Sequence, residues 1–248
     1  MEWVKRKEGK FGADTNIIDK KIKDTVFHIG TLRVEEAKAV SKERANRKNK
    51  AISKQLTVLS NLEKEKESSK NTILVISGPS GCGKSYLVQS LVNNRPDLFH
   101  NLPQATSRER RHPDENGYLF LQPQTFSRIR ETLIGRTSHN DNHYGTFPDF
   151  KDNFINTIIL SKGGLEDLYN CLDDEKIYAN VIVLGIDANM DIIPDSAKRE
   201  GRDKDFLERE RRVLDMAHYV YERKDETDYP TVESVVELLS NLSSDYIL

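Results

Sequence analysis

Short apolar runs separated by helical patterns fill most of the chain after residue 70. Three of these runs are rich in β-branched side chains, which predicts strands that are buried on both faces of a sheet. They are NTILVIS at 71–77, NTIILS at 156–161 and ANVIVLGI at 179–186. The segments at 204–224 and 231–242 instead space their apolar positions as a helix does. This alternation predicts an α/β fold with a mostly parallel sheet flanked by helices.

The beginning of the chain follows a different pattern. Residues 33–67 contain neither glycine nor proline and favour a helix, on which Ile52, Leu56 and Leu59 are spaced as one apolar face. With 248 residues, the chain is long enough for one α/β domain and an appendage. The predicted regions are a mostly helical N-terminal extension at 1–70 and a main domain at 71–248.

The charges divide at the same place. Residues 1–70 carry 18 basic and 11 acidic side chains, a net charge of +7, whereas residues 71–248 carry 20 and 29, a net charge of −9. Residues 38–54 hold seven basic side chains and one acid. A solvated helix with a short apolar seam explains this stretch, and an arm that binds nucleic acid or another partner is the alternative.

Other features indicate the compartment. No apolar run approaches the roughly 18 residues that cross a bilayer, and the first residues lack the apolar core and cleavage site of a secretory signal. The two cysteines are Cys82 and Cys171, and Cys82 lies inside a glycine-rich stretch, so a structural disulfide is not expected. These features predict a cytoplasmic protein that does not bind membranes.

The glycine-rich stretch GPSGCGKS at 78–85 fits the pattern G-x-x-x-x-G-K-[ST] between a predicted strand and a predicted helix. Its glycines let the backbone curl so that several N–H groups point into one concavity, and the following helix N-terminus adds positive potential. Lys84 then reaches the β- and γ-phosphates, and Ser85 ligates Mg²⁺. We therefore predict binding of ATP with Mg²⁺. The expected contacts are Gly78, Ser80, Gly81, Cys82, Gly83, Lys84, Ser85 and Tyr86.

A second group of polar residues lies between residues 104 and 146. Arg108, Arg110 and Arg111 crowd four positions, and Tyr144 follows later. Guanidinium groups suit a phosphate monoester because they offer paired donors, and tyrosine hydroxyls can complete such a cage. A solvated charged loop is the alternative interpretation.

The order of these stretches resembles the guanylate kinase family. GPSGCGKS is followed by T-S-R-x-x-R, E-N-G-Y-x-F and Y-G-T, and the resemblance covers roughly residues 71–243. It implies a P-loop kinase-type fold with a small acceptor-binding insertion at about 103–150. It also implies that four residues hold the phosphate of a nucleoside monophosphate, with Gln104 and Thr146 beside them in the acceptor site. The four are Arg108, Arg111, Tyr118 and Tyr144.

The base-binding positions depart from the family pattern. The family's guanine-reading serine falls at Gln104, its guanine-reading glutamate falls near Gly135 or Arg136, and an acidic pair is replaced by Ser161-Lys162. A carboxylate accepts the N1–H and N2–H₂ donors of guanine, which neither glycine nor arginine can do. We therefore expect a retained phosphate end and altered base selectivity.

The resemblance also implies a lid at about 195–207, whose arginines close over the transferred phosphoryl group. Arg199 and Arg202 lie on a short glycine-containing segment, and Arg209 lies on the helix expected to follow. Phosphoryl transfer requires positioning and charge neutralisation more than a strong base. The expected catalytic residues are Lys84, Arg199, Arg202 and Arg209.

The function expected from these features is that of an ATP-dependent nucleoside monophosphate kinase, which moves the γ-phosphoryl of ATP to a (deoxy)nucleoside monophosphate. Two alternatives remain open. One is a kinase acting on a polynucleotide or another phosphate-bearing acceptor, guided by the basic helix at 38–54. The other is a guanylate-kinase-like binding module without catalysis, which Ser161-Lys162 favours and the intact Lys84 and Ser85 oppose.

Overall fold

The computed structural model divides the chain into two units, which are described separately. One unit combines residues 1–10 with 71–248, and the other contains residues 11–70. The N-terminal residues therefore group with the main domain, whereas the sequence pattern had placed all of 1–70 in the extension. The residues that the structure describes are 3–6, 24–26, 28–29, 31, 50–60, 71–174, 177, 179–188, 190–193 and 204–242.

In the unit at 11–70, a described helix covers residues 50–60. Its predicted apolar face is confirmed only in part: Ile52 is buried and Leu59 half-buried, but the Leu56 side chain is 42% exposed. The basic stretch at 38–54 lies outside the described residues except for its last five positions. Its predicted role in partner binding therefore stays a prediction.

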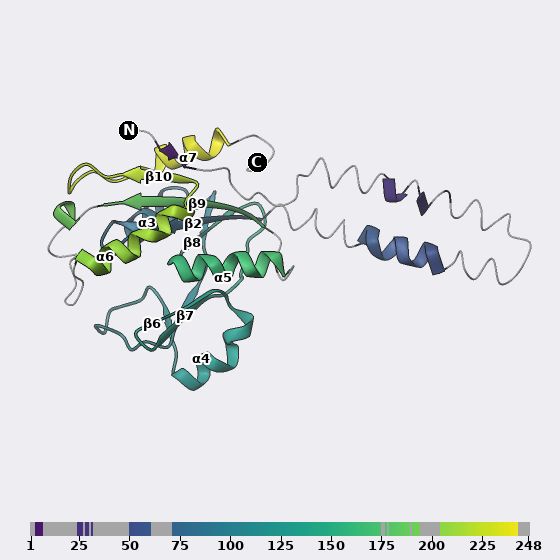
Figure 1. Cartoon of the computed structure of the whole chain (residues 1–248), viewed down its shortest axis with the longest axis horizontal. Coiled ribbons are helices and arrows are strands. Elements are labelled where there is room, and N and C mark those ends of the chain that lie inside the picture. The colour runs from purple at the N-terminus through teal and green to yellow at the C-terminus, as the bar shows by residue number, and fades with distance from the viewer. Residues whose placement is uncertain are drawn as a thin grey trace, which may run out of the picture. The chain divides into compact units, whose positions relative to one another are not determined.

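The main unit is built on one six-stranded sheet (Figure 1). All neighbouring strands are parallel except β1, which is antiparallel to β10 at one edge. The three strands expected from apolar runs are confirmed as β2, β8 and β9. In spatial order the strands are β1 (Val4–Lys5), β10 (Tyr219–Glu222), β9 (Asn180–Asp187), β2 (Thr72–Ser77), β8 (Ile155–Ile159) and β3 (Phe99–Asn101).

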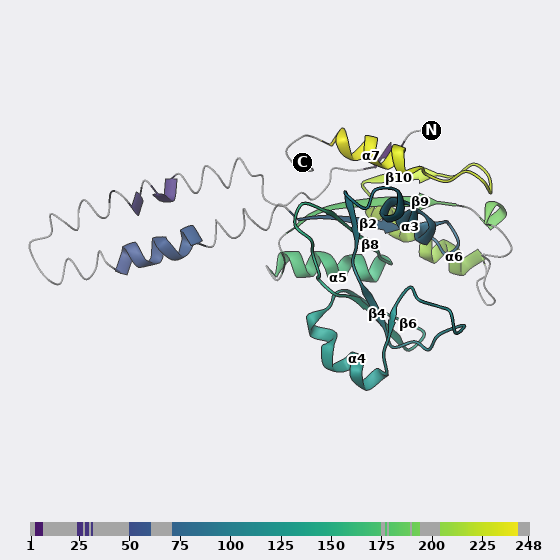
Figure 2. The same ribbon diagram turned by 180° about the vertical axis from the view of Figure 1, so that it is seen from behind.

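Helices cover both faces of this sheet. Helices α5 (Lys162–Asp173) and α6 (Lys204–Arg211) lie on the face nearer the viewer in Figure 1, and α3 (Lys84–Asn94) lies on the opposite face, which Figure 2 shows. The last helix, α7 (Val232–Ser240), contacts α3. Short 3-10 helices are η1 (Arg130–Thr132), η2 (Met190–Ile192) and η4 (Arg212–Met216). Within the described part of the chain, no helix combines the length and apolarity needed to cross a membrane.

The single long helix predicted at 204–224 is wrong. The chain leaves the helix after Arg211, continues through η4 and enters strand β10 at Tyr219. Pairing with β9 decides this conformation, because Tyr219 lies opposite Leu184 and Val220 opposite Gly185. Tertiary pairing overrides a local apolar spacing that fits a helix.

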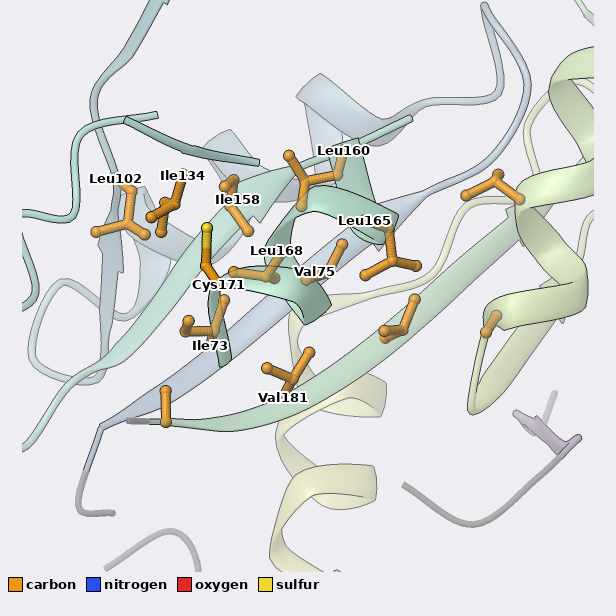
Figure 3. Packing of buried hydrophobic residues seen from close by; sticks show 14 of the residues in the cluster. Ile73, Val75, Leu102, Ile134, Ile158, Leu160, Leu165, Leu168, Cys171 and Val181 are labelled. Atoms are coloured by element: carbon orange, nitrogen blue, oxygen red, sulfur yellow. The ribbon is translucent and has the colours of Figure 1, made fainter. Parts of the chain in front are cut away.

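The core follows from the alternation of side chains along the strands. Ile73 and Val75 of β2 face α5, where they pack in one buried cluster with Leu165 and Leu168 (Figure 3). The intervening residues of β2 point to the other face, as successive strand side chains do. Leu74 and Ile76 are fully buried there, and so is Leu91 of α3. Each such side chain contributes roughly 1.5–3 kcal/mol by its burial.

A second sheet with its own helix forms the insertion between β3 and β8. Its order is β5-β4-β7-β6, and Ala105, Phe126 and Leu133 form its small core. Strand β6 contacts α5, so the insertion is seated on the main sheet's covering helix. The elements are β4 (Gln104–Thr106), β5 (Leu119–Phe120), α4 (Pro123–Ile129), β6 (Ile134–His139) and β7 (Asn142–Thr146).

Candidate active site

The phosphate loop, residues 78–85, joins β2 to α3 at the carboxyl edge of the sheet. Gly78 has φ 142°, and a Cβ placed there would lie 2.2 Å from the carbonyl oxygen of Ile186. Gly83 has φ 103°, and a Cβ there would lie 2.6 Å from the ring of Tyr229. Glycine is required at both positions because any other side chain would collide with these neighbours.

The Lys84 side chain folds back over the loop. The Lys84 ammonium donates to the carbonyl oxygens of Gly78 at 2.9 Å and Pro79 at 2.6 Å, so it lies over the loop. Ser85 and Tyr86 are exposed in the first turn of α3. Cys82 is buried beneath the loop, and burial raises the pKa of its thiol. The loop therefore offers backbone N–H groups and one ammonium to an anionic ligand.

Arg223, at the end of the sheet, supports the loop from below, and sequence reasoning missed it. Its side chain is buried and donates to backbone carbonyl oxygens of Asp228 at 2.8 Å, Glu226 at 2.7 Å and Cys82 at 3.4 Å. Its guanidinium also lies 3.9 Å from the ring centroid of Tyr229, the ring that packs on Gly83. Arg223 thus ties the turn at 224–229 to the phosphate loop. No local pattern indicates this role, since Cys82 is 141 positions away in sequence.

The four residues expected to hold the acceptor phosphate lie together on the insertion. The Tyr118 and Tyr144 rings meet edge to face, with centroids 5.9 Å apart, and Tyr144 raises the pKa of Arg108, although less than Glu115 does. We call Arg108, Arg111, Tyr118 and Tyr144 the acceptor cage. The Nε atom of Arg108 is buried and has no hydrogen-bond partner among the described residues.

Glu115 organises this cage, although the sequence analysis did not include it among the site residues. Its carboxylate receives two hydrogen bonds from Arg108, at 2.7 and 3.1 Å, and one from the Arg111 backbone N–H at 2.8 Å. The hydrogen bonds from Arg108 lower the pKa of Glu115 to about 2. The arginines can therefore hold an anion, and the chain's own carboxylate occupies them.

Gln104, which the family resemblance places in the acceptor site, has a fixed orientation. Its Nε2 donates to the carbonyl oxygen of Ile159 at 3.1 Å and to the Thr146 hydroxyl at 3.2 Å. A carbonyl only accepts, so the amide nitrogen must face it, and both of its protons are used there. The oxygen Oε1 is then the group with which Gln104 can contact another molecule.

Arg136 forms ion pairs with two carboxylates. Its Nη2 lies 2.9 Å from Asp167 of α5 and its Nη1 2.9 Å from Glu131. The hydrogen bond to Asp167 is the main cause that raises the pKa of Arg136. At the neighbouring Gly135, φ is +60° and a Cβ would lie 2.7 Å from the Leu160 side chain, so a larger residue would strain the backbone and require Leu160 to shift. The glutamate expected near these two positions therefore has no direct substitute at either one.

Ser161 and Lys162, which replace the family's acidic pair after β8, contact the first turns of α5. The Ser161 hydroxyl accepts from the Gly164 N–H at 3.4 Å and caps α5, and Lys162 lies 3.8 Å from Glu166 on the same helix. A carboxylate does occur at the end of β9, the strand on the other side of β2. There Asp187 forms a two-pronged ion pair with Arg211, at 2.6 and 2.8 Å.

Of the predicted lid, only the part within α6 belongs to the described residues. Arg199 and Arg202 lie outside them. Arg209 is exposed on α6, and its neighbour Glu210 accepts a hydrogen bond from the Ser80 N–H of the phosphate loop at 2.6 Å. The helix that carries Arg209 therefore touches the phosphate loop.

The guanylate kinase family model matches residues 70–151 of this chain. The chain is 32% identical over 120 residues to the guanylate kinase of Mycoplasma pneumoniae, which covers 45% of this chain and 48% of the relative. It is 37% identical over 79 residues to the guanylate kinase of Porphyromonas gingivalis, and this match covers 30% of this chain and 42% of the relative. In these matches the chain spans less than half the length of its curated relatives.

Among solved structures, the crystal structure of guanylate kinase from Anaplasma phagocytophilum aligns with a TM-score of 0.46 at 16% identity, covering 73% of this chain and 88% of that one. The family match itself contains the phosphate loop, Gln104 and all of the acceptor cage as far as Tyr144. The segment at 70–151 is therefore similar to guanylate kinases.

Proposed function

We propose that this protein is an ATP-dependent nucleoside monophosphate kinase, which transfers the γ-phosphoryl of ATP to a (deoxy)nucleoside monophosphate. One observation carries the proposal: a complete phosphate loop and a four-residue cage for a second phosphate occur in one structural unit. Transfer between two bound phosphates needs in-line positioning and charge neutralisation. Lys84 supplies charge at the transferred group, and the cage orients the acceptor.

The Ser85 hydroxyl, in the first turn after the loop, suits a Mg²⁺ ion carried by the nucleotide. Arg209 is proposed as a catalytic arginine because the next residue of α6 already contacts the loop. Arg199 and Arg202 are proposed with it on the family resemblance alone. A reducing compartment such as the cytoplasm suits the thiols of Cys82 and Cys171, which are both buried and not joined in a disulfide.

We further propose that base selectivity is altered. Gln104 offers one fixed acceptor, Oε1, where a dedicated guanine site needs acceptors for both N1–H and N2–H₂. Arg136 is held by Asp167 and Glu131, and Gly135 has no side chain that could accept a hydrogen bond. Guanine would therefore form fewer hydrogen bonds here than in a site where a carboxylate accepts from both N1–H and N2–H₂.

The test is a coupled ADP-release screen over the common ribo- and deoxyribonucleoside monophosphates with MgATP. Turnover of at least one acceptor is expected, and Lys84→Met should abolish it while the circular dichroism spectrum is retained. Lys151→Met is the control, because that exposed lysine precedes the amino end of β8. A preference for GMP and dGMP above about 10³-fold, which a dedicated hydrogen-bonding site can reach, would refute the altered selectivity.

A second candidate is a binding module without catalysis, favoured by the structural use of Ser161 and Lys162 at the start of α5. It predicts binding of MgATP and a nucleoside monophosphate by calorimetry, without ADP release for any acceptor. Measured turnover that disappears in Lys84→Met would exclude it.

A further inference from the structure

A carboxylate of the chain itself lies on the phosphate loop. The Ser80 N–H donates to Glu210 Oε2 at 2.6 Å, although the two residues are 130 positions apart. Ser80 is the third residue of the loop, and its N–H donates to an anionic group there. A carboxylate resembles a phosphate oxygen in the two properties that this donor recognises, negative charge and acceptance of hydrogen bonds.

The residue after Glu210 anchors the same helix beside the loop. Arg211 holds Asp187 with two hydrogen bonds, at 2.6 and 2.8 Å. Asp187 is two residues beyond Gly185, which lies opposite Ser77, the residue directly before the loop. Helix α6 is thus attached at the loop by two consecutive residues of opposite charge, one on the loop itself and one on the strand next to it.

We propose that Glu210 is an internal competitor of the ATP polyphosphate and that nucleotide binding must first release it. The inference rests on the proposed function insofar as it takes ATP as the ligand of the loop. The Ser80 N–H cannot serve both acceptors, and a carboxylate beside a triphosphate is repelled by like charge. Release of Glu210 detaches α6 from the loop, so ATP binding is coupled to the position of the helix that carries Arg209.

The proposal predicts that substitution of Glu210 strengthens ATP binding. When only the released form binds, the measured dissociation constant is the intrinsic one divided by the released fraction. Removing the charge of Glu210 raises that fraction, so ATP should bind more tightly, whereas loss of a residue that assists binding would weaken it. A charge-assisted hydrogen bond of ordinary strength corresponds to about a tenfold change or more.

The experiment compares wild type, Glu210→Gln, Glu210→Ala and the control Glu237→Gln, which removes the same charge from an exposed position on α7. In the first arm, hydrogen exchange of the Ser80 amide is measured without nucleotide. It should be faster in both Glu210 variants than in wild type and in the control. In the second arm, calorimetry measures binding of a non-hydrolysable MgATP analogue, which should be about tenfold tighter or more in both Glu210 variants.

Unchanged exchange at Ser80, or analogue binding that is unchanged or weaker in the Glu210 variants, would overturn the proposal. Weaker binding in particular would make Glu210 an assisting residue, for instance through Mg²⁺. Absence of analogue binding in all four proteins would overturn this inference and the proposed function together. Absence of ADP release, with tighter analogue binding in the variants, would overturn the kinase function alone.

Discussion

Glu115 shows how one side chain determines the state of a binding site. It lies 2.7 Å from Arg108 and 3.6 Å from Arg111, so its single negative charge offsets part of the positive charge of the two arginines. The sequence predicts the four cage residues through the family resemblance, but it does not predict this contact. Asp114 and Glu115 are adjacent acids on one turn, and only the folded loop shows which of them faces the arginines.

The lowered pKa of Glu115 predicts a pH dependence of stability. The group has its usual pKa of 4.5 in the unfolded chain and about 2 in the folded one. A lowered pKa stabilises the fold above pH 4.5, and this contribution is lost as the pH falls from 4.5 toward 2. Wild type should therefore exceed Glu115→Gln in free energy of unfolding by about 1–3 kcal/mol at pH 6, since Arg111 is partly screened by water.

Urea unfolding of both proteins between pH 2.5 and pH 7 measures this difference. The two stabilities should converge as the pH falls below 4.5. A gap between them that stays constant across the whole range would show that Glu115 is not held by the arginines in solution.

Among the elements, strands and helices differ in how well local sequence predicts them. The central strands β2, β8 and β9 are buried on both faces, and continuous apolar runs predict them correctly. Strand β10 is missed because Val213, Ala217 and Val220 also fit the spacing of a helix face. Site contacts such as Ser80–Glu210 and Arg223–Cys82 join residues more than 100 positions apart, and no local pattern encodes them.

The turn at 224–229 and the phosphate loop should behave as one structural element. In Gly83→Ala, the new methyl group meets the Tyr229 ring and the backbone must keep φ 103°. A cost of about 1–3 kcal/mol is typical for a non-glycine residue held in such a conformation. We expect weaker MgATP binding and a melting temperature lower by several degrees.

Two further variants separate the causes of this effect. Gly83→Ala with Tyr229→Ala removes the collision but keeps the backbone cost, so it should recover only part of the loss. Gly117→Ala is the control, because nothing lies within 4 Å of its added Cβ. Wild-type affinity for MgATP in Gly83→Ala would contradict the tight packing of Tyr229 on the loop.

At the scale of the whole molecule, residues 11–70 lie in the chain between β1 and β2, which belong to one sheet. Their replacement tests whether the main unit folds without them. Replacing these residues by six Gly and Ser residues leaves ten residues between Arg6 and Asn71. Ten extended residues reach up to about 33 Å. Strands β1 and β2 lie three strand spacings apart in the sheet, about 14 Å, so the shortened linker can join them. This variant should fold and bind MgATP, because it retains β1.

A variant that lacks residues 1–70 should be less stable than the variant in which residues 11–70 are replaced. It removes the pairing of β1 with β10, the edge contact of Trp3 with Tyr221 and the Arg6–Glu222 ion pair. Thermal melts followed by circular dichroism compare the two. Equal melting temperatures would mean that β1 adds nothing to the main unit.

The pairing of β1 also has a consequence for the order in which the protein is made. Val4 lies opposite Val220, 216 positions later in the chain. At about 5–20 residues per second, a ribosome takes roughly 10 to 45 s to produce that partner. The first strand must wait, unpaired, until nearly the whole sheet has been synthesised. Such distant contacts form late, so we expect β1 to join the sheet after β2, β8 and β9 have paired.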